Sequence, residues 1–192
     1  MNVISSILFA ISANADNLVV GLSYGINKIK IRPISNLIIS IITVTGTILS
    51  MSLSKVIVRF LPVYISSIIG SVILILIGAW TLFKILFKKT NLNSILNNPE
   101  KADKDNSLDI DRKEAIILAF ALSINNMGLG IGASITGLNV IITSFFTFVF
   151  SLLMIRIGHF SGTNYLSKIF GQRAEVVSCL IIIALGVIEF FT

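Results

Sequence analysis

The sequence has few of the residues from which soluble domains, disulfide scaffolds and most enzyme sites are built. Only 12% of its 192 residues are charged, against about a quarter in soluble domains. The single cysteine, Cys179, excludes an intramolecular disulfide and a thiolate metal cage. Paired histidine ligands are excluded by the single histidine, and neither a Ser/His/Asp set nor a glycine-rich phosphate loop is present. We therefore expect no enzyme activity.

Apolar residues dominate what is present. They make up 55% of the chain, and the mean hydropathy is +0.95. Runs of about 20 apolar residues, each long enough to cross a bilayer as a helix, lie near 3–25, 34–54, 63–87, 114–136, 139–158 and 174–191. The first run is too long for the apolar region of a cleavable signal peptide, so none is expected. The composition predicts an all-α polytopic membrane protein with six transmembrane helices in the lipid bilayer.

The positions of the basic residues predict the orientation. Of the lysines and arginines, 13 lie at the ends of the first, third and fifth runs or in the segments that follow them, and only Lys55 and Arg59 fall on the other side. The positive-inside rule places these three segments in the cytoplasm and both termini outside a bacterial-type plasma membrane. The net charge of +6 is thus a feature of topology, and we expect no nucleic-acid partner.

The first and fourth apolar runs carry the same motif. "ISANADNLVVGLSYG", residues 11–25, aligns with "FALSINNMGLGIGAS", residues 120–134, at a constant offset of 109 residues. Because three crossings reverse the direction of the chain, we expect two inverted three-helix repeats, an architecture typical of transporters. The repeats are residues 1–87 and 114–192, and a cytoplasmic acidic loop, residues 88–113, joins them.

Polar side chains of the motif are candidates for a site near the middle of the membrane. A charge at that depth costs at least about 2.5–3.5 kcal/mol, so Asp16 needs polar partners or an ion. Carboxylate, amide and hydroxyl oxygens suit a hard cation such as Mn²⁺, Mg²⁺ or Na⁺. The candidate ion ligands are Asp16, Asn17, Asn125 and Asn126, with Asn14 and Ser123 as supporting oxygens. The alternative for each asparagine is a hydrogen bond between helices, worth about 0.6 kcal/mol on average.

Small residues recur every four positions in both motif helices. Gly21 and Gly25 continue one face of the first helix, and Gly130 occupies the matching position of the fourth. Columns of small residues let two backbones approach closely. We therefore expect these glycines to let the two motif helices approach each other.

The two motif copies, together with "AEVVSCLIIIALG" at residues 174–186, resemble the manganese efflux pump (MntP) family, and within it the YtaF-type sporulation membrane proteins. The resemblance covers nearly the whole chain. It implies six helices, cation efflux, and a cation site at paired acidic positions of the first and fourth helices. The chain departs from this pattern because Asp16 is present but its partner is Asn125, which favours a weaker or monovalent site.

The cytoplasmic loop contains "DKDNSLDIDRKE", which matches most of the twelve-residue calcium-loop pattern. The candidate ligands for Ca²⁺ or Mn²⁺ are Asp103, Asp105, Ser107, Asp109 through its carbonyl, Asp111 and Glu114. The mismatch is Leu108, at the position where the pattern has glycine for a sharp turn. The alternative is a solvated linker in which Asp111 caps the fourth helix and Glu114 lies in its first turn.

Two further functions remain open from the sequence. Export of a small organic solute would require an extended apolar cavity instead of a compact set of oxygens. A non-transporting membrane protein involved in sporulation would require no solvent path to Asp16. The sequence is compatible with a homodimer, and His159, beside Ser161 and Gly162, is expected to be an interfacial residue instead of a metal ligand.

Overall fold

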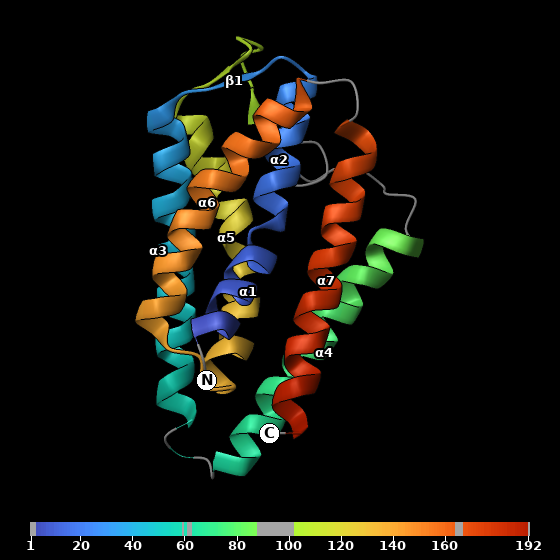
Figure 1. Cartoon of the computed structure of the whole chain (residues 1–192). Helices are drawn as coiled ribbons and strands as arrows, with labels where there is room; N and C mark the ends of the chain where they lie inside the picture. The colour runs from blue at the N-terminus through green and yellow to red at the C-terminus, as the bar shows by residue number, and fades with distance from the viewer. Residues whose placement is uncertain (1–2, 59, 61–62, 88–101, 164–166, 192) are drawn as a thin grey trace.

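The computed structural model describes residues 3–58, 60, 63–87, 102–163 and 167–191. Long helices packed side by side make up most of this part of the chain, and two short strands lie at one end (Figure 1). The elements in chain order are α1 (Val3–Ala13), α2 (Ala15–Ile26), β1 (Lys30–Ile31), α3 (Pro33–Val58), α4 (Val63–Phe87), β2 (Asp109–Ile110), α5 (Arg112–Ile135), α6 (Val140–Gly162) and α7 (Ser167–Phe191).

The long helices have the length and composition of membrane spans. Four spans are identified in the described residues, namely Val3–Ile26, Pro33–Val56, Arg112–Ile135 and Val140–Gly162. The other two long helices, α4 and α7, contain the apolar stretches Ile68–Phe83 and Cys179–Ile188. Large apolar side chains such as Ile141, 81% exposed, point outward, as lipid-facing residues do. The expected all-α membrane protein with six helical segments is confirmed, although the first segment consists of two helices.

The first segment is interrupted at Asn14, between α1 and α2. The Asn14 side chain donates to the Ala10 carbonyl at 2.7 Å, a bond that competes with the backbone ladder of the helix. The Asn14 N–H then donates to the Ile11 carbonyl at 3.3 Å, in a tighter turn than the α-helix has. A residue that bonds locally in this way turns the expected straight span into two helices in sequence.

The helices pack in three main pairs: α2 against α6, α3 against α5, and α4 against α7. In Figure 1, α4 and α7 lie together along one side of the bundle. In the α2–α6 pair, both helices carry glycines where the two backbones meet. A Cβ atom on Gly158 would overlap the Leu18 carbonyl, and one on Gly21 would overlap the Ile155 carbonyl. The two backbones therefore touch where neither helix has a side chain.

At one end of the bundle, the two short strands pair with each other and β2 is hydrogen-bonded to the start of α3. β1 and β2 pair in parallel, with Lys30 opposite Asp109 and Ile31 opposite Ile110. The Ser35 hydroxyl donates to the Ile110 carbonyl at 2.7 Å, and Ile110 is fully buried in an apolar cluster. The start of α1 and the end of α7 lie at the opposite end of the bundle (Figure 1). Residues 88–101 of the expected loop lie outside the described residues.

We predict that Gly158→Ala destabilises the protein by about 1–3 kcal/mol, because the added methyl must push α2 and α6 apart. Gly128→Ala is the matched control, since its Cβ would meet only the Ile77 Cδ1 atom at 3.8 Å, an ordinary contact. The control should be neutral or stabilising by up to about 1 kcal/mol, because alanine favours a helix. Thermal unfolding of both purified variants in detergent measures the difference, and equal melting temperatures would contradict the prediction.

Candidate functional site

The structure places Asp16 against Asn125, across the two motif helices. The Asn125 Nδ2 atom donates to the Asp16 Oδ2 atom at 3.3 Å, and the backbone N–H of Asn17 donates to the Asp16 Oδ1 atom at 2.8 Å. Both side chains are partly buried. Asp16 lies in the first turn of α2, where the partial positive charge of a helix N-terminus favours a carboxylate. The two positions that the repeat aligns are thus in contact.

Asn14 and Asn17 belong to a separate, fully buried polar cluster. The Asn17 amide donates to the Asn14 Oδ1 atom and to the Ser151 hydroxyl, both at 2.9 Å. Ser151 in turn donates to the Ser40 hydroxyl at 2.9 Å. The Asn14 amide also reaches the Thr147 carbonyl of α6 at 3.4 Å. These two asparagines therefore tie α1 and α2 to α6 and α3, and neither makes a side-chain hydrogen bond to α5 among those described.

Several buried polar atoms in the described part of the bundle lack a hydrogen-bond partner. Both side-chain polar atoms of Asn126 are in this state, although Asn126 is only 1% exposed. The Asn17 Oδ1 atom and the hydroxyls of Thr43 and Thr147 are in the same state. Buried polar groups are nearly always paired in proteins. Neutral oxygens of this kind are groups that a water molecule or a hard cation satisfies.

Ser123 lies against α3. A Cβ atom on Gly46 would overlap the Ser123 hydroxyl, so the missing side chain at that position makes room for it. Together with the two clusters above, this divides the six expected ion ligands. Asp16 and Asn125 meet each other, Asn14 and Asn17 face α6, and Ser123 faces α3. Asn126, the sixth, is buried with both of its side-chain polar atoms unpaired.

Sequence reasoning missed the polar partners on α6 and α3. They are Thr143, Thr147 and Ser151 on α6, and Asn36, Ser40, Thr43, Thr47, Ser50 and Ser54 on α3, all buried. The signal was present in both apolar runs as small polar residues repeated every three or four positions, which places them on one helix face. Such a stripe indicates a helix face that packs inside a bundle instead of facing lipid.

The glycines expected to bring the motif helices together have other partners. Cβ atoms on Gly21 and Gly25 would overlap the backbone carbonyls of Ile155 and His159 in α6, and one on Gly130 would overlap the Ser50 hydroxyl of α3. The first motif helix therefore packs its glycines on α6, and α5 packs Gly130 on α3. The pattern of small residues predicted close packing, but it carries no information on which helix lies opposite.

In the acidic loop, carboxylate oxygens of Asp103, Asp105 and Glu114 lie within 4.8 Å of one another. Each of these side chains accepts backbone hydrogen bonds. Asp103 accepts the N–H groups of Ser107 and Leu108, at 3.0 and 2.9 Å. Hydrogen bonds from the side chain and the backbone of Ser107 lower the pKa of the Asp105 carboxyl below its usual value. A cation at this point would share these carboxylate oxygens with the backbone donors, because each carboxylate offers about four lone pairs.

The remaining loop candidates have structural partners. Asp111 caps α5, since its Oδ1 atom accepts the Glu114 N–H at 2.8 Å, while Glu114 accepts the Asp111 N–H at 3.2 Å. Asp109 forms an ion pair with Arg32, and the Ser107 hydroxyl donates to the Asp109 carbonyl at 3.0 Å. The helix cap that the sequence allowed is thus present. Binding of Ca²⁺ or Mn²⁺ by the loop stays a prediction.

Comparison with known proteins gives a family and two relatives. A family model described as "Putative manganese efflux pump" matches residues 1–82 and 89–189. The chain is 35% identical over 188 residues to the "Probable sporulation protein YtaF" of Bacillus subtilis, which covers 88% of the chain and 89% of that protein. It is 32% identical over 94 residues to the "Putative manganese efflux pump MntP" of Acetivibrio thermocellus, over 47% of the chain and 44% of that protein. No solved structure matches.

Leu108 adopts a left-handed backbone conformation, with φ at +58°, at the turn where the calcium-loop pattern has glycine. This conformation costs a residue with a Cβ atom about 1–2 kcal/mol. We predict that Leu108→Gly stabilises the protein by about 1 kcal/mol, since Leu108 is 53% exposed and its removal loses little burial.

Asn106 provides the matched control for this prediction, because its φ is +55° and asparagine tolerates the left-handed region. Asn106→Gly should change the melting temperature in detergent much less than Leu108→Gly does. A melting temperature that falls with Leu108→Gly would show that the leucine side chain matters more than the backbone strain.

Proposed function

The chain belongs to the MntP family of manganese efflux pumps, and from this premise we propose that it exports Mn²⁺ from the cytoplasm. The substrate site of this proposal lies at Asp16 and Asn125. Mn²⁺ is a hard cation that carboxylate and amide oxygens suit. The family match covers both motif helices, and the Acetivibrio thermocellus relative, which aligns over 47% of the chain, carries the same description of activity.

The contact between Asp16 and Asn125 is the observation that carries the proposal. An ionised carboxylate inside a membrane segment is costly and is usually functional. Here it lies beside a helix interruption, with one amide donor from α5 and one backbone N–H from α2. A cation could replace the amide donor at this carboxylate, since the amide of Asn125 also carries an oxygen that can act as a ligand.

We further propose that the two halves of the chain are inverted repeats. Reciprocal contacts between α4 and α7 support this arrangement. A Cβ atom on Gly78 would touch the Ile183 side chain and the Cys179 carbonyl, and one on Gly186 would touch the Ile75 side chain and the Ser71 carbonyl. Each residue of the first set matches one of the second at an offset of 108 residues.

The other helix pairs support the same symmetry. The first motif helix packs on α6, the middle helix of the second half, and α5 packs on α3, the middle helix of the first half. A two-fold relation exchanges these two contacts and leaves α4 opposite α7. Sites of inverted-repeat transporters lie near the repeat interface, at interrupted helices, and Asp16 follows such an interruption.

The proposed orientation places the end with the strands in the cytoplasm. This end carries Lys28, Lys30 and Arg32, which lie in or near β1, the strand that pairs with β2 of the acidic loop. The positive-inside rule assigns this end to the cytoplasm, and the termini lie at the other end (Figure 1). Asp16 would then be loaded from the side of the paired strands.

A second candidate function is that of a non-transporting membrane protein in sporulation. The relative that covers most of the chain is named a probable sporulation protein, and Asn125 leaves the proposed site with one carboxylate. The two functions differ in one observable, since only an exporter changes the manganese content of the cell. Export of a small organic solute would leave manganese unchanged as well.

We predict that cells without their own manganese exporter accumulate less Mn²⁺ when they produce this protein, and that Asp16→Asn abolishes the effect. The substitution removes the only charge of the proposed site while it keeps the size of the side chain. Lys55→Gln is the control, because it also removes one charge, at an exposed position that belongs to neither candidate metal site. Whole-cell manganese is measured at equal protein abundance. Equal manganese content with the wild-type protein and Asp16→Asn would remove the proposal.

We predict that Asn125→Asp strengthens binding of divalent cations, by about tenfold or more, because affinity for hard cations rises with the number of carboxylate ligands. Calorimetric titration of Mn²⁺ into the purified protein and the variant measures this change. Asn139→Asp is the comparison variant, since Asn139 is an exposed cap of α6 outside the proposed site and aspartate caps a helix as well as asparagine does. Equal gains in affinity at the two positions would show that only total charge, and not the contact between the motif helices, controls binding.

A further inference from the structure

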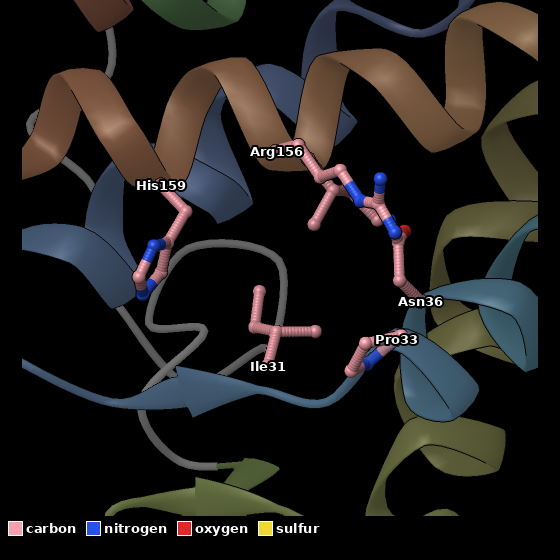
Figure 2. A pocket seen from close by; sticks show the side chains of 6 residues that line it. Ile31, Pro33, Asn36, Arg156 and His159 are labelled. Atoms are coloured by element: carbon pink, nitrogen blue, oxygen red, sulfur yellow. The ribbon is translucent and has the colours of Figure 1, made fainter.

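A cavity of about 110 Å³ lies at the strand end of the bundle, between β1 and the adjacent ends of α3 and α6. Figure 2 shows its walls: Ile31 from β1, Pro33 and Asn36 from the start of α3, and Arg156 and His159 from α6; Ile155 also lines it. None of the features argued above for transport uses these side chains. The cavity is therefore a separate site candidate.

The polar side chains of this cavity suit an anion that also carries a hydrogen-bond donor. Arg156 is exposed and forms no ion pair or hydrogen bond within the described part of the chain. The Asn36 side chain is 98% buried, with its Nδ2 atom bound to the Leu152 carbonyl at 3.1 Å and its Oδ1 atom without a partner. Figure 2 shows the Arg156 and Asn36 side chains pointing toward one another. The Arg156 guanidinium group and the unpaired Asn36 Oδ1 atom thus belong to residues that line the same cavity.

A backbone carbonyl already engages His159, and the carboxylate nearby is paired with another arginine. The His159 Nε2 atom lies 3.0 Å from the Ile29 carbonyl, which can only accept, so this nitrogen carries the proton and donates. The carboxylate closest along the paired strands, Asp109, is engaged with Arg32. The described lining of the cavity itself contains no acidic residue. An arginine with no carboxylate partner suits a phosphate group.

Exposed apolar side chains lie on α3 and α6, the two helices that line the cavity. The exposed residues of α3 next to it are Ile34, Leu37 and Ile41, and those of α6 are Leu153, Ile157 and Phe160. Pro33 begins α3, and His159 lies three residues before the end of α6, so the cavity is at the depth of lipid headgroups. A phosphate in the cavity could therefore carry acyl chains that continue along the apolar surfaces of α3 and α6.

We propose that this cavity binds the phosphate of an anionic phospholipid. Arg156 pairs with the phosphate, and a headgroup hydroxyl, such as those of phosphatidylglycerol, donates to the Asn36 Oδ1 atom. A free phosphate ion offers the same charge, but it leaves the adjacent apolar surfaces uncovered. The proposal does not depend on transport, because it uses neither Asp16 nor Asn125.

Thermal unfolding of the full-length protein in detergent tests the proposal. The probes are dioctanoyl forms of phosphatidylglycerol, phosphatidylmethanol and phosphatidylcholine, and inorganic phosphate. Phosphatidylglycerol should reach half-maximal stabilisation at a concentration about tenfold lower than phosphatidylcholine does. Phosphatidylmethanol, which is anionic but has no headgroup hydroxyl, should fall between the two. Stabilisation by inorganic phosphate that equals that by phosphatidylglycerol would overturn the assignment to a lipid.

Substitutions locate the effect. Arg156→Gln should remove the preference for phosphatidylglycerol over phosphatidylcholine, and Asn36→Leu should remove only the preference over phosphatidylmethanol. Lys30→Gln is the matched control, since Lys30 is an exposed cation at the same end that does not line the cavity. If Lys30→Gln reduced the preference as much as Arg156→Gln, general surface charge would explain binding and the proposal would be overturned. If Asn36→Leu fails to fold, the wild-type comparison of the two anionic lipids decides the role of the hydroxyl.

Discussion

The architecture depends on one constraint: polar groups inside a membrane segment must find their partners within the protein. Asp16 is the most demanding of these groups because it carries a charge. Its carboxylate receives an amide from α5 and a backbone N–H from its own helix. The second contact is available because α2 begins immediately before Asp16, after the interruption at Asn14. The interruption therefore brings a helix N-terminus, with its free N–H groups, to the charge.

The same constraint explains why the helices pack as they do. The asparagine that interrupts the first segment cannot face lipid, so Asn14 and Asn17 bury their amides against Thr147 and Ser151 of α6. These hydrogen bonds require the backbones to be close, and glycines on both helices allow it, since Cβ atoms there would overlap the opposite carbonyls. Polar residues and glycines are thus two parts of one contact. Without the glycines, the side chains of Asn14 and Asn17 would not reach α6. Without the asparagines, the close contact of the two backbones would have no hydrogen bonds to support.

The sequence predicted the membrane segments well because length and apolar composition determine them locally. It also paired Asp16 with Asn125, which are in contact, because an internal repeat relates distant positions. It did not predict the interruption at Asn14, where a side-chain hydrogen bond competes with the helix ladder. It assigned the glycines the wrong partners, since a face of small residues fits any other helix. The parallel pair of β1 and β2 was also missed, because two strands of two residues carry no periodic signal.

The single carboxylate gives the proposed site a property that two carboxylates would not have. Two adjacent carboxylates without a cation repel each other, so one of them has to take up a proton. An asparagine beside an aspartate avoids this requirement, because its amide donates a hydrogen bond to the empty carboxylate and its oxygen can face a cation. Under the proposed function, the site can therefore empty without protonation, and rotation of the Asn125 amide is the change between the empty and loaded states. The Asn125 amide then takes the place of the departing cation at the Asp16 carboxylate, which favours release. The affinity for the cation is also lower than at a site with two carboxylates.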